Sequence, residues 1–197
     1  MQNVLIIGDG SFAREVESYI SICDKNGDFE RKINAIGFAG KDNEDFAFSE
    51  RDHYSSFFNG IGNQNRKQIL AKFVERTKSY EWPALIVGRS LENLGYTTGL
   101  IVAPNATVSV NCRIGDFCIV NYNASVGHDC EIGDYVTICP NVSIGGWCKL
   151  GNESYIGAGA NILPKIKIGE RAIIGAGAVV TKDVPDGVIA KGVPAKW

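Results

Sequence analysis

The sequence is poor in the residues on which several classes of site depend. Its 197 residues include only two histidines, and its six cysteines contain no Cys-x-x-Cys pair, which argues against a zinc ribbon or a thioredoxin-type redox site. The net charge of -2 provides no basic surface, so nucleic acid and anionic membranes are not expected partners. No uninterrupted apolar run reaches the roughly 20 residues that a membrane-spanning helix needs. The first ten residues lack the features of a signal peptide, so we expect a cytoplasmic protein without membrane insertion.

The second half of the chain carries an aliphatic residue at every sixth position. The fourteen positions are Val102, Val108, Ile114, Val120, Val126, Ile132, Ile138, Ile144, Leu150, Ile156, Ile162, Ile168, Ile174 and Val180. A period of six fits neither an α-helix nor a simple strand, and it predicts a parallel β-helix in which three hexapeptide units form a coil of about 18 residues. We expect these aliphatic side chains to point inward. Glycine often follows them directly, and we expect it to supply turns with positive φ.

A mostly small residue stands four positions after each aliphatic one. Four of the six cysteines occupy this position, namely Cys112, Cys118, Cys130 and Cys148. A buried thiol behaves as a small apolar group. We therefore interpret these cysteines as part of the β-helix core rather than as metal ligands or disulfides.

The first half of the chain alternates predicted strands and helices. An apolar strand at Val4–Ile7 is followed by a glycine turn, and then by a helix with Ser11 as a candidate N-cap. The expected apolar face of this helix consists of Val16, Tyr19 and Ile20. A glycine turn before a helix can bind an anion, but the same turn also occurs without a ligand.

Further strands are expected at "INAIGFAG" and "PALIVG", with a polar connection over residues 40–66 and a helix around Lys67 to Lys78. Alternating strands and helices indicate an α/β domain with a parallel sheet. The sequence therefore predicts an α/β domain over residues 1–99, followed by a β-helix domain with a carboxy-terminal tail over residues 100–197.

Four segments together carry a family resemblance: "IGDGSFAREV", "GIGNQNRKQI", "GHDCEIGDY" within the hexad array, and the closing "GVPAKW". They resemble the sialic-acid and nucleotide-sugar O/N-acetyltransferases. In that family a small Rossmann-like domain precedes a left-handed β-helix. The resemblance implies the left hand, acetyl-CoA as co-substrate, a nucleotide-linked sugar as acceptor, and assembly as a homotrimer.

The resemblance also assigns roles to individual positions. It implies that His128 is a general base, that Asp129 is its acidic partner, and that the Gly146 amide holds the oxyanion. It places Ala158 and Ala176 against coenzyme A. On the acceptor side, the matching positions are Gly10, Ser11, Phe12, Gly62 and Asn121.

Two departures from the family pattern matter. Many relatives carry a second histidine at the position of Thr137, where it contacts the acetyl donor; threonine can donate one hydrogen bond there. Relatives often have acidic residues after the second strand, where this chain has Ala39 and Gly40. Recognition of the base or sugar can therefore differ, and the connection over 40–66 is a candidate replacement.

His128 has several competing interpretations. Inward positions in its hexad are already filled by Val126 and Cys130, which disfavours a core histidine. A surface histidine without function remains an alternative. A base role requires a corner at this point, because adjacent side chains on a strand face opposite ways and His128 must contact Asp129. A zinc site of this fold would need three histidines, whereas the repeat contains only His128. The other histidine, His53, lies in the polar connection of the first domain. We interpret it as a solvated side chain, with nucleotide-sugar binding as the alternative.

The resulting hypothesis is an acetyl-CoA-dependent N-acetyltransferase that acts on the amine of a nucleotide-linked 4-amino-4,6-dideoxy sugar. Sugar O-acetylation of the sialic-acid type is the nearest alternative. Serine and simple-sugar acetyltransferases do not account for the amino-terminal domain. A non-catalytic β-helix that binds a sugar nucleotide is the alternative from another class. The sequence leaves open the nucleotide, the ring position and the choice between amine and hydroxyl.

Overall fold

The computed structural model describes residues 2–7, 11–26, 33–39, 56–59, 67, 68, 70, 71, 74, 82–90 and 97–197. The chain divides into two compact units, Met1–Leu85 and Ile86–Trp197. Within the described ranges, no helix is long and apolar enough to cross a membrane.

The amino-terminal unit contains a parallel three-stranded sheet. Strand β1 (Gln2–Ile7) lies between β2 (Ile33–Ala39) and β3 (Ser56–Asn59), and helix α1 (Ser11–Asn26) connects β1 to β2. The predicted apolar face of the helix is confirmed, since Val16 and Ile20 are fully buried and Tyr19 is nearly so. The α/β character with a parallel sheet is therefore confirmed. Strand β3 was not predicted, because two phenylalanines in a polar segment are too short a run to show a strand period.

The expected strand at "PALIVG" does form, but the prediction that it belongs to the α/β sheet is wrong. Strand β4 (Leu85–Ile86) joins a sheet of the β-helix instead. The Val87 N–H donates to the Val102 carbonyl at 2.9 Å, and the Arg89 N–H donates to the Ala106 carbonyl at 2.7 Å. A short apolar run shows that a strand can form without showing which sheet will pair with it. The first strands of the β-helix thus precede residue 100.

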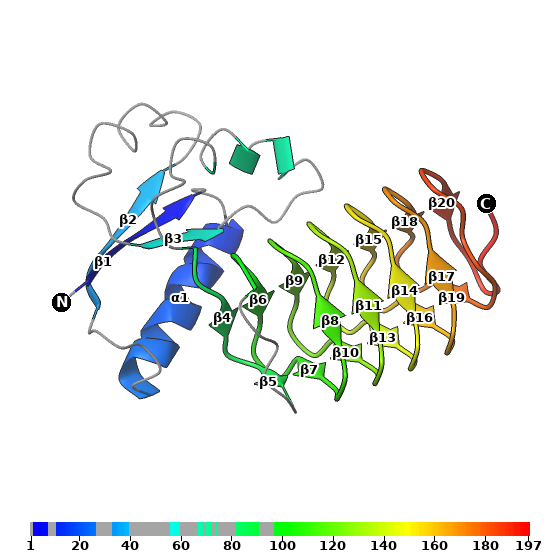
Figure 1. Cartoon of the computed structure of the whole chain (residues 1–197), viewed down its shortest axis with the longest axis horizontal. Helices are drawn as coiled ribbons and strands as arrows, with labels where there is room; N and C mark the ends of the chain where they lie inside the picture. Colours follow the sequence, from blue (N-terminus) through cyan, green and yellow to red (C-terminus); the bar gives the residue numbers. More distant parts are fainter. Residues whose placement is uncertain are drawn as a thin grey trace. The chain divides into compact units, whose positions relative to one another are not determined.

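The β-helix has three parallel sheets that form its walls (Figure 1). Sheet I contains β5 (Arg89–Ser90), β7 (Thr107–Val108), β10 (Ser125–Val126), β13 (Ser143–Ile144), β16 (Asn161–Ile162) and β19 (Val179–Val180). Sheet II contains β8 (Arg113–Ile114), β11 (Glu131–Ile132), β14 (Lys149–Leu150) and β17 (Lys167–Ile168). Sheet III contains β4, β6 (Ile101–Val102), β9 (Ile119–Val120), β12 (Thr137–Ile138), β15 (Tyr155–Ile156), β18 (Ile173–Ile174) and β20 (Ile189–Ala190).

The register confirms the coil length predicted from the hexads. Ser125 pairs with Ser143 and Val126 with Ile144, so these strands stack at a separation of 18 residues. The last coil is shorter, because Ile173 of β18 pairs with Ile189 of β20, 16 residues later. All fourteen aliphatic hexad residues are buried, which confirms that they point inward. The chain passes from sheet III to sheet I to sheet II in each coil, and we name the three corners I–II, II–III and III–I after the sheets they join.

The corners use glycine in a different way from the one predicted. For thirteen of the fourteen inward aliphatics, the residue three positions later has positive φ; Asp183, after Val180, is the exception. Most of these thirteen residues are not glycine: Asn105, Asn111, Phe117, Asn123, Asp129, Tyr135, Asn141, Trp147, Glu153, Lys165 and Arg171. The glycines directly after the aliphatics do not have positive φ. A Cβ on Gly127 would lie 2.6 Å from the Gly146 nitrogen, and one on Gly145 would lie 2.6 Å from the Pro164 nitrogen. These glycines are therefore required by the close approach of successive coils.

Candidate active site

His128 and Asp129 lie at the I–II corner, between β10 and β11. Asp129 has φ 58°, in the left-handed region, and the chain turns there. This turn brings two adjacent side chains together, and the His128 Nδ1 lies 2.7 Å from the Asp129 Oδ2. The direct contact that the sequence hypothesis required is thus present, at a corner.

The Asp129 carboxylate is held on both oxygens. Its Oδ2 contacts His128, and its Oδ1 accepts a hydrogen bond of 3.1 Å from the Asn111 Nδ2. The hydrogen bond with His128 lowers the pKa of Asp129 below its ordinary value, and the bond from Asn111 lowers it further. An ionised carboxylate only accepts hydrogen bonds, so in the neutral imidazole this contact favours the tautomer with the proton on Nδ1 and the lone pair on Nε2. This is the tautomer that a general base on Nε2 needs.

Gly146 stands beside the free ring nitrogen, one coil after His128. A Cβ at this position would lie 2.8 Å from the His128 Nε2 and 2.9 Å from its Cε1. Only glycine leaves this space open. Among the described residues, no acceptor is bonded to the Gly146 N–H. A base nitrogen and an unpaired amide donor therefore stand at adjacent positions of successive coils, which is an arrangement suited to acyl transfer.

The II–III corner differs because side-chain oxygens accept hydrogen bonds from several of its backbone N–H groups. The carboxylate or amide oxygen of one coil accepts a hydrogen bond from the backbone of the previous coil, in the pairs Thr98 with Asp116, Asp116 with Asp134, Asp134 with Asn152 and Glu170 with Asp186, at 2.8–2.9 Å. This corner is closed by the protein itself. The amides of Gly146, Ala158 and Ala176 have no such partner within the described ranges.

Trp147 follows Gly146 and packs against His128. The two rings are 4.3 Å apart between centroids and cross at 82°, in an edge-to-face arrangement. The Lys165 ammonium lies 5.6 Å from the centroid of the indole ring. Sequence analysis missed Asn111 and Trp147. The predicted coil length could have identified them, because each lies 18 residues from Asp129 and therefore at the same corner in a neighbouring coil.

Three other predicted site residues lie along a different corner. Asn121 follows β9, Ala158 follows β15 and Ala176 follows β18, so all three belong to the III–I corner. Sheet I separates this corner from the I–II corner that carries His128 and Gly146. The Asn121 Oδ1 accepts a hydrogen bond of 2.8 Å from the Tyr122 N–H. One chain therefore does not bring these three residues together with His128.

The remaining predicted positions are distributed over both units. Thr137 lies in β12 of sheet III, is 4% exposed and pairs with Tyr155 in the neighbouring strand. A hydrogen bond with Cys139 raises the pKa of Tyr155 to about 12. Ser11 and Phe12 form the start of α1, where Ser11 is exposed and Phe12 is half-buried. Gly10, Gly62 and His53 lie outside the described residues.

The cysteines of the repeat pack behind the corners. All six cysteines are free; Cys118, Cys130 and Cys148 are buried, whereas Cys112 is half-buried. The Cys130 thiol donates to the Gly145 carbonyl at 3.3 Å. Hydrogen bonds with Cys112 and Cys148, together with burial, raise the pKa of Cys130, which keeps its thiol neutral. Among the residues described, no group of three or more histidine, cysteine or acidic side chains could hold a metal ion.

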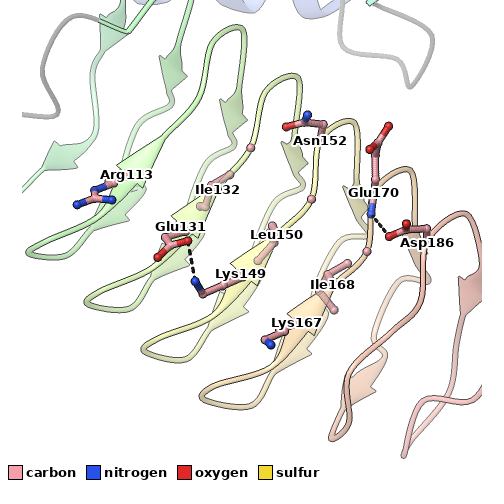
Figure 2. A pocket seen from close by; sticks show the side chains of 13 residues that line it. Arg113, Glu131, Ile132, Lys149, Leu150, Asn152, Lys167, Ile168, Glu170 and Asp186 are labelled. Atoms are coloured by element: carbon pink, nitrogen blue, oxygen red, sulfur yellow. Dashed lines mark hydrogen bonds and ion pairs between the residues drawn. The ribbon is translucent and has the colours of Figure 1, made fainter.

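A hollow of about 540 Å³ lies over sheet II, with charged side chains along it (Figure 2). The outward residues of successive strands are Arg113, Glu131, Lys149 and Lys167, and Lys149 pairs with Glu131 at 2.8 Å. His128 is not part of its lining. The mixture of charges is typical of a solvated wall, and the chemistry of the I–II corner identifies that corner as the better candidate site.

Comparisons with known proteins bear on the fold and on the class of activity. The model of the bacterial transferase hexapeptide family (six repeats) matches residues 111–146 and 148–182. No curated protein matches the sequence. A mutant of perosamine N-acetyltransferase from Caulobacter crescentus, with one histidine replaced by asparagine and in complex with CoA and GDP-perosamine, is 28% identical, with a TM-score of 0.86 over 100% of this chain and 96% of that chain.

Two further solved structures have the same architecture over almost their whole length. The acetyltransferase domain of PglB from Neisseria gonorrhoeae, in complex with acetyl coenzyme A, is 25% identical, with a TM-score of 0.83 over 99% of this chain and 98% of that chain. WeeI from Acinetobacter baumannii is 26% identical, with a TM-score of 0.79 over 100% of this chain and 99% of that chain. These similarities confirm the resemblance to hexapeptide-repeat sugar acetyltransferases that was inferred from the sequence.

Proposed function

We propose that this chain is an acetyl-CoA-dependent N-acetyltransferase that acts on the amine of a nucleotide-linked 4-amino-4,6-dideoxy sugar. The observation that carries the proposal is the His128–Asp129 pair with its free Nε2 next to the unpaired Gly146 amide. The similar perosamine N-acetyltransferase, whose structure contains CoA together with GDP-perosamine, supports both the donor and the class of acceptor.

The proposed reaction begins with the acceptor amine in its unprotonated form. Its lone pair attacks the thioester carbonyl carbon, a C–N bond forms, and the carbonyl oxygen becomes an oxyanion that the Gly146 N–H stabilises. The amine proton passes to the His128 Nε2, while Asp129 stabilises the imidazolium through Nδ1. The oxyanion then collapses, the C–S bond breaks, and coenzyme A leaves as a thiolate that takes up the proton from His128.

We further propose that the amino-terminal unit, Met1–Leu85, is Rossmann-like and binds the nucleotide. The β1–α1–β2 unit supports this, because a helix that starts soon after a strand presents free backbone amides to a phosphate. Gly10, Ser11, Phe12 and Gly62 are the proposed contacts. The left hand of the β-helix and a cytoplasmic location belong to the same proposal and rest on the family.

The proposed enzyme is a homotrimer with each active site between two subunits. The separation of His128 and Gly146 from Asn121, Ala158 and Ala176 supports this proposal, since a second subunit can place its III–I corner against the I–II corner of the first. In this arrangement the backbone at Ala158 and Ala176 holds coenzyme A, Thr137 contacts the acetyl donor, and Asn121 lines the cleft.

The direct test is release of free thiol from acetyl-CoA with UDP-, dTDP- and GDP-linked 4-amino-4,6-dideoxy sugars. Turnover with one of them is expected, and His128→Ala should lower kcat by roughly 10²–10⁴-fold with the fold intact. Circular dichroism and the oligomer size of the variant serve as folding controls. Turnover only with hydroxyl acceptors would favour sugar O-acetylation, and no turnover with either class would favour a binding protein.

A further inference from the structure

The stack along the I–II corner contains two residues whose side chains contact the His128–Asp129 pair from neighbouring coils. Asn111 lies one coil before Asp129 and bonds to its Oδ1 at 3.1 Å. Trp147 lies one coil after Asp129 and contacts the His128 ring at 4.3 Å between centroids. All three corner residues, Asn111, Asp129 and Trp147, have φ between 57° and 59°.

Neither side chain is required by the geometry of the coil. Glycine occupies the equivalent corner position at Gly99, Gly159 and Gly177, with φ of 60°, 69° and 67°. A bulky residue is unfavourable in the left-handed region. The Trp147 indole is also 51% exposed, so burial in the core does not explain it. Its one aromatic contact among the described residues is His128, and its cation contact there is Lys165.

We propose that Asn111 and Trp147 are positioning residues for the general base. Asn111 holds the carboxylate plane so that Oδ2 faces Nδ1, and Trp147 restricts the rotation of the imidazole so that Nε2 stays beside Gly146. Small errors in the position of a catalytic group reduce rates strongly. This proposal deepens the proposed function and depends on it only for the kinetic part of the test.

The experiment compares four glycine substitutions in the full chain. Asn111→Gly and Trp147→Gly remove the two contacts, and glycine is already compatible with this corner position. Asn105→Gly and Tyr135→Gly are matched controls, because they have φ of 60° and 58°. Tyr135 also stacks on Phe117, with ring centroids 5.2 Å apart, at the II–III corner, away from His128.

The first measurement is the ¹⁵N spectrum of histidine-labelled protein without ligand. The chain has two histidines, so His53→Gln assigns the signals of His128. In the unmodified chain, His128 should occupy one tautomer with the proton on Nδ1. Asn111→Gly and Trp147→Gly should each produce a mixture of tautomers or a broadened ring signal, and the two controls should not.

The second measurement separates kcat from KM. We expect Asn111→Gly and Trp147→Gly to lower kcat by about 10-fold to 100-fold, with KM for both substrates within about twofold. Trp147→Phe should restore most of the lost kcat, since it keeps an aromatic ring against His128. Unchanged spectra and an unchanged kcat would overturn the proposal, and so would an increase in KM at constant kcat, which indicates contact with a ligand. If His128→Ala remained active, the base assignment would fail, whereas the spectra would still decide whether the two residues hold the ring.

Discussion

At the corner between β10 and β11, the reactivity of His128 depends on which of its two ring nitrogens is available. Nδ1 is occupied by Asp129 at 2.7 Å, so a proton can be taken up only at Nε2. The space next to Nε2 exists because Gly146 has no side chain. A base therefore arises from two short-range features of adjacent coils, a hydrogen bond at one nitrogen and an empty volume at the other.

Gly146→Ala tests this empty volume. Gly146 does not have positive φ, so its backbone accepts alanine, but the new Cβ would lie 2.8 Å from Nε2 and must displace the ring. We expect kcat to fall by about 100-fold or more with little change in the melting temperature. Gly187→Ala is the control: its Cβ would meet nothing within 4 Å, although φ of 66° strains the backbone. Full activity of Gly146→Ala would show that Nε2 is not the reacting nitrogen.

Asp129→Asn tests the hydrogen bond at Nδ1. An amide can donate to Nδ1 and so stabilise the wrong tautomer, and we expect kcat to fall by up to about 10⁴-fold. The pKa of Asp129 is lowered in the folded chain, chiefly by His128, so its contribution to stability is complete above the ordinary pKa of aspartate and is lost as the pH falls through the lowered value. Urea unfolding should show that the stability difference between the two proteins is constant at neutral pH and shrinks in strong acid. A difference that grew in acid would contradict the sign of this shift.

Within the coils, one inward position carries a polar side chain where the equivalent positions are apolar. The small position next to the II–III corner holds Cys118, Val136, Ser154 and Ala172 in successive coils. Ser154 is fully buried, and its Oγ has no hydrogen-bond partner among the residues described. An unpaired buried hydroxyl destabilises the folded state.

Ser154→Ala should therefore raise the free energy of unfolding by about 1 kcal/mol. Alanine already occupies the equivalent position at Ala172, so the change creates no steric problem. Urea unfolding at a fixed protein concentration measures the effect, since association would otherwise change the apparent stability. Ser143→Ala, at an exposed position of β13, is the control and should change the stability by less than about 0.5 kcal/mol. A loss of stability in Ser154→Ala would contradict this prediction.

At the scale of the whole molecule, the proposed catalytic and donor-binding residues lie on two different corners of one β-helix. A wall of six strands, sheet I, stands between them. One subunit cannot fold its own III–I corner onto its I–II corner, because stacked parallel strands hold the wall rigid. Activity should consequently require association.

Complementation between two inactive variants tests this requirement. His128→Ala removes the base, and Ala176→Trp places a large side chain at an exposed position where coenzyme A is proposed to bind. Each variant alone should be inactive. A random equal mixture should recover roughly a quarter of the normal turnover, because each mixed trimer contains one site with both residues intact. A mixture without activity would indicate that each site lies within one chain.

Much of the fold could be predicted because its information is local in the sequence. The hexad period identifies the β-helix, the 18-residue coil and the fourteen inward side chains, since each inward position repeats the same requirement for an aliphatic residue. His128 and Asp129 were assigned through the family resemblance, and the hexad register is compatible with a turn at this point. The sheet to which β4 belongs could not be predicted, because an apolar dipeptide fits either unit.

The repeat and the inward residues could be inferred from the sequence alone, and the candidate base from the family resemblance. The tertiary structure alone decided what surrounds that base, because contacts between residues 18 apart form only when coils stack in register. Asn111 and Trp147 reach the His128–Asp129 pair in this way, and Gly146 opens the space at Nε2. Stacking also explains why glycine follows many of the aliphatic residues, since the next coil lies too close to leave room for a Cβ. The positive φ at the corners is adopted mainly by residues other than glycine.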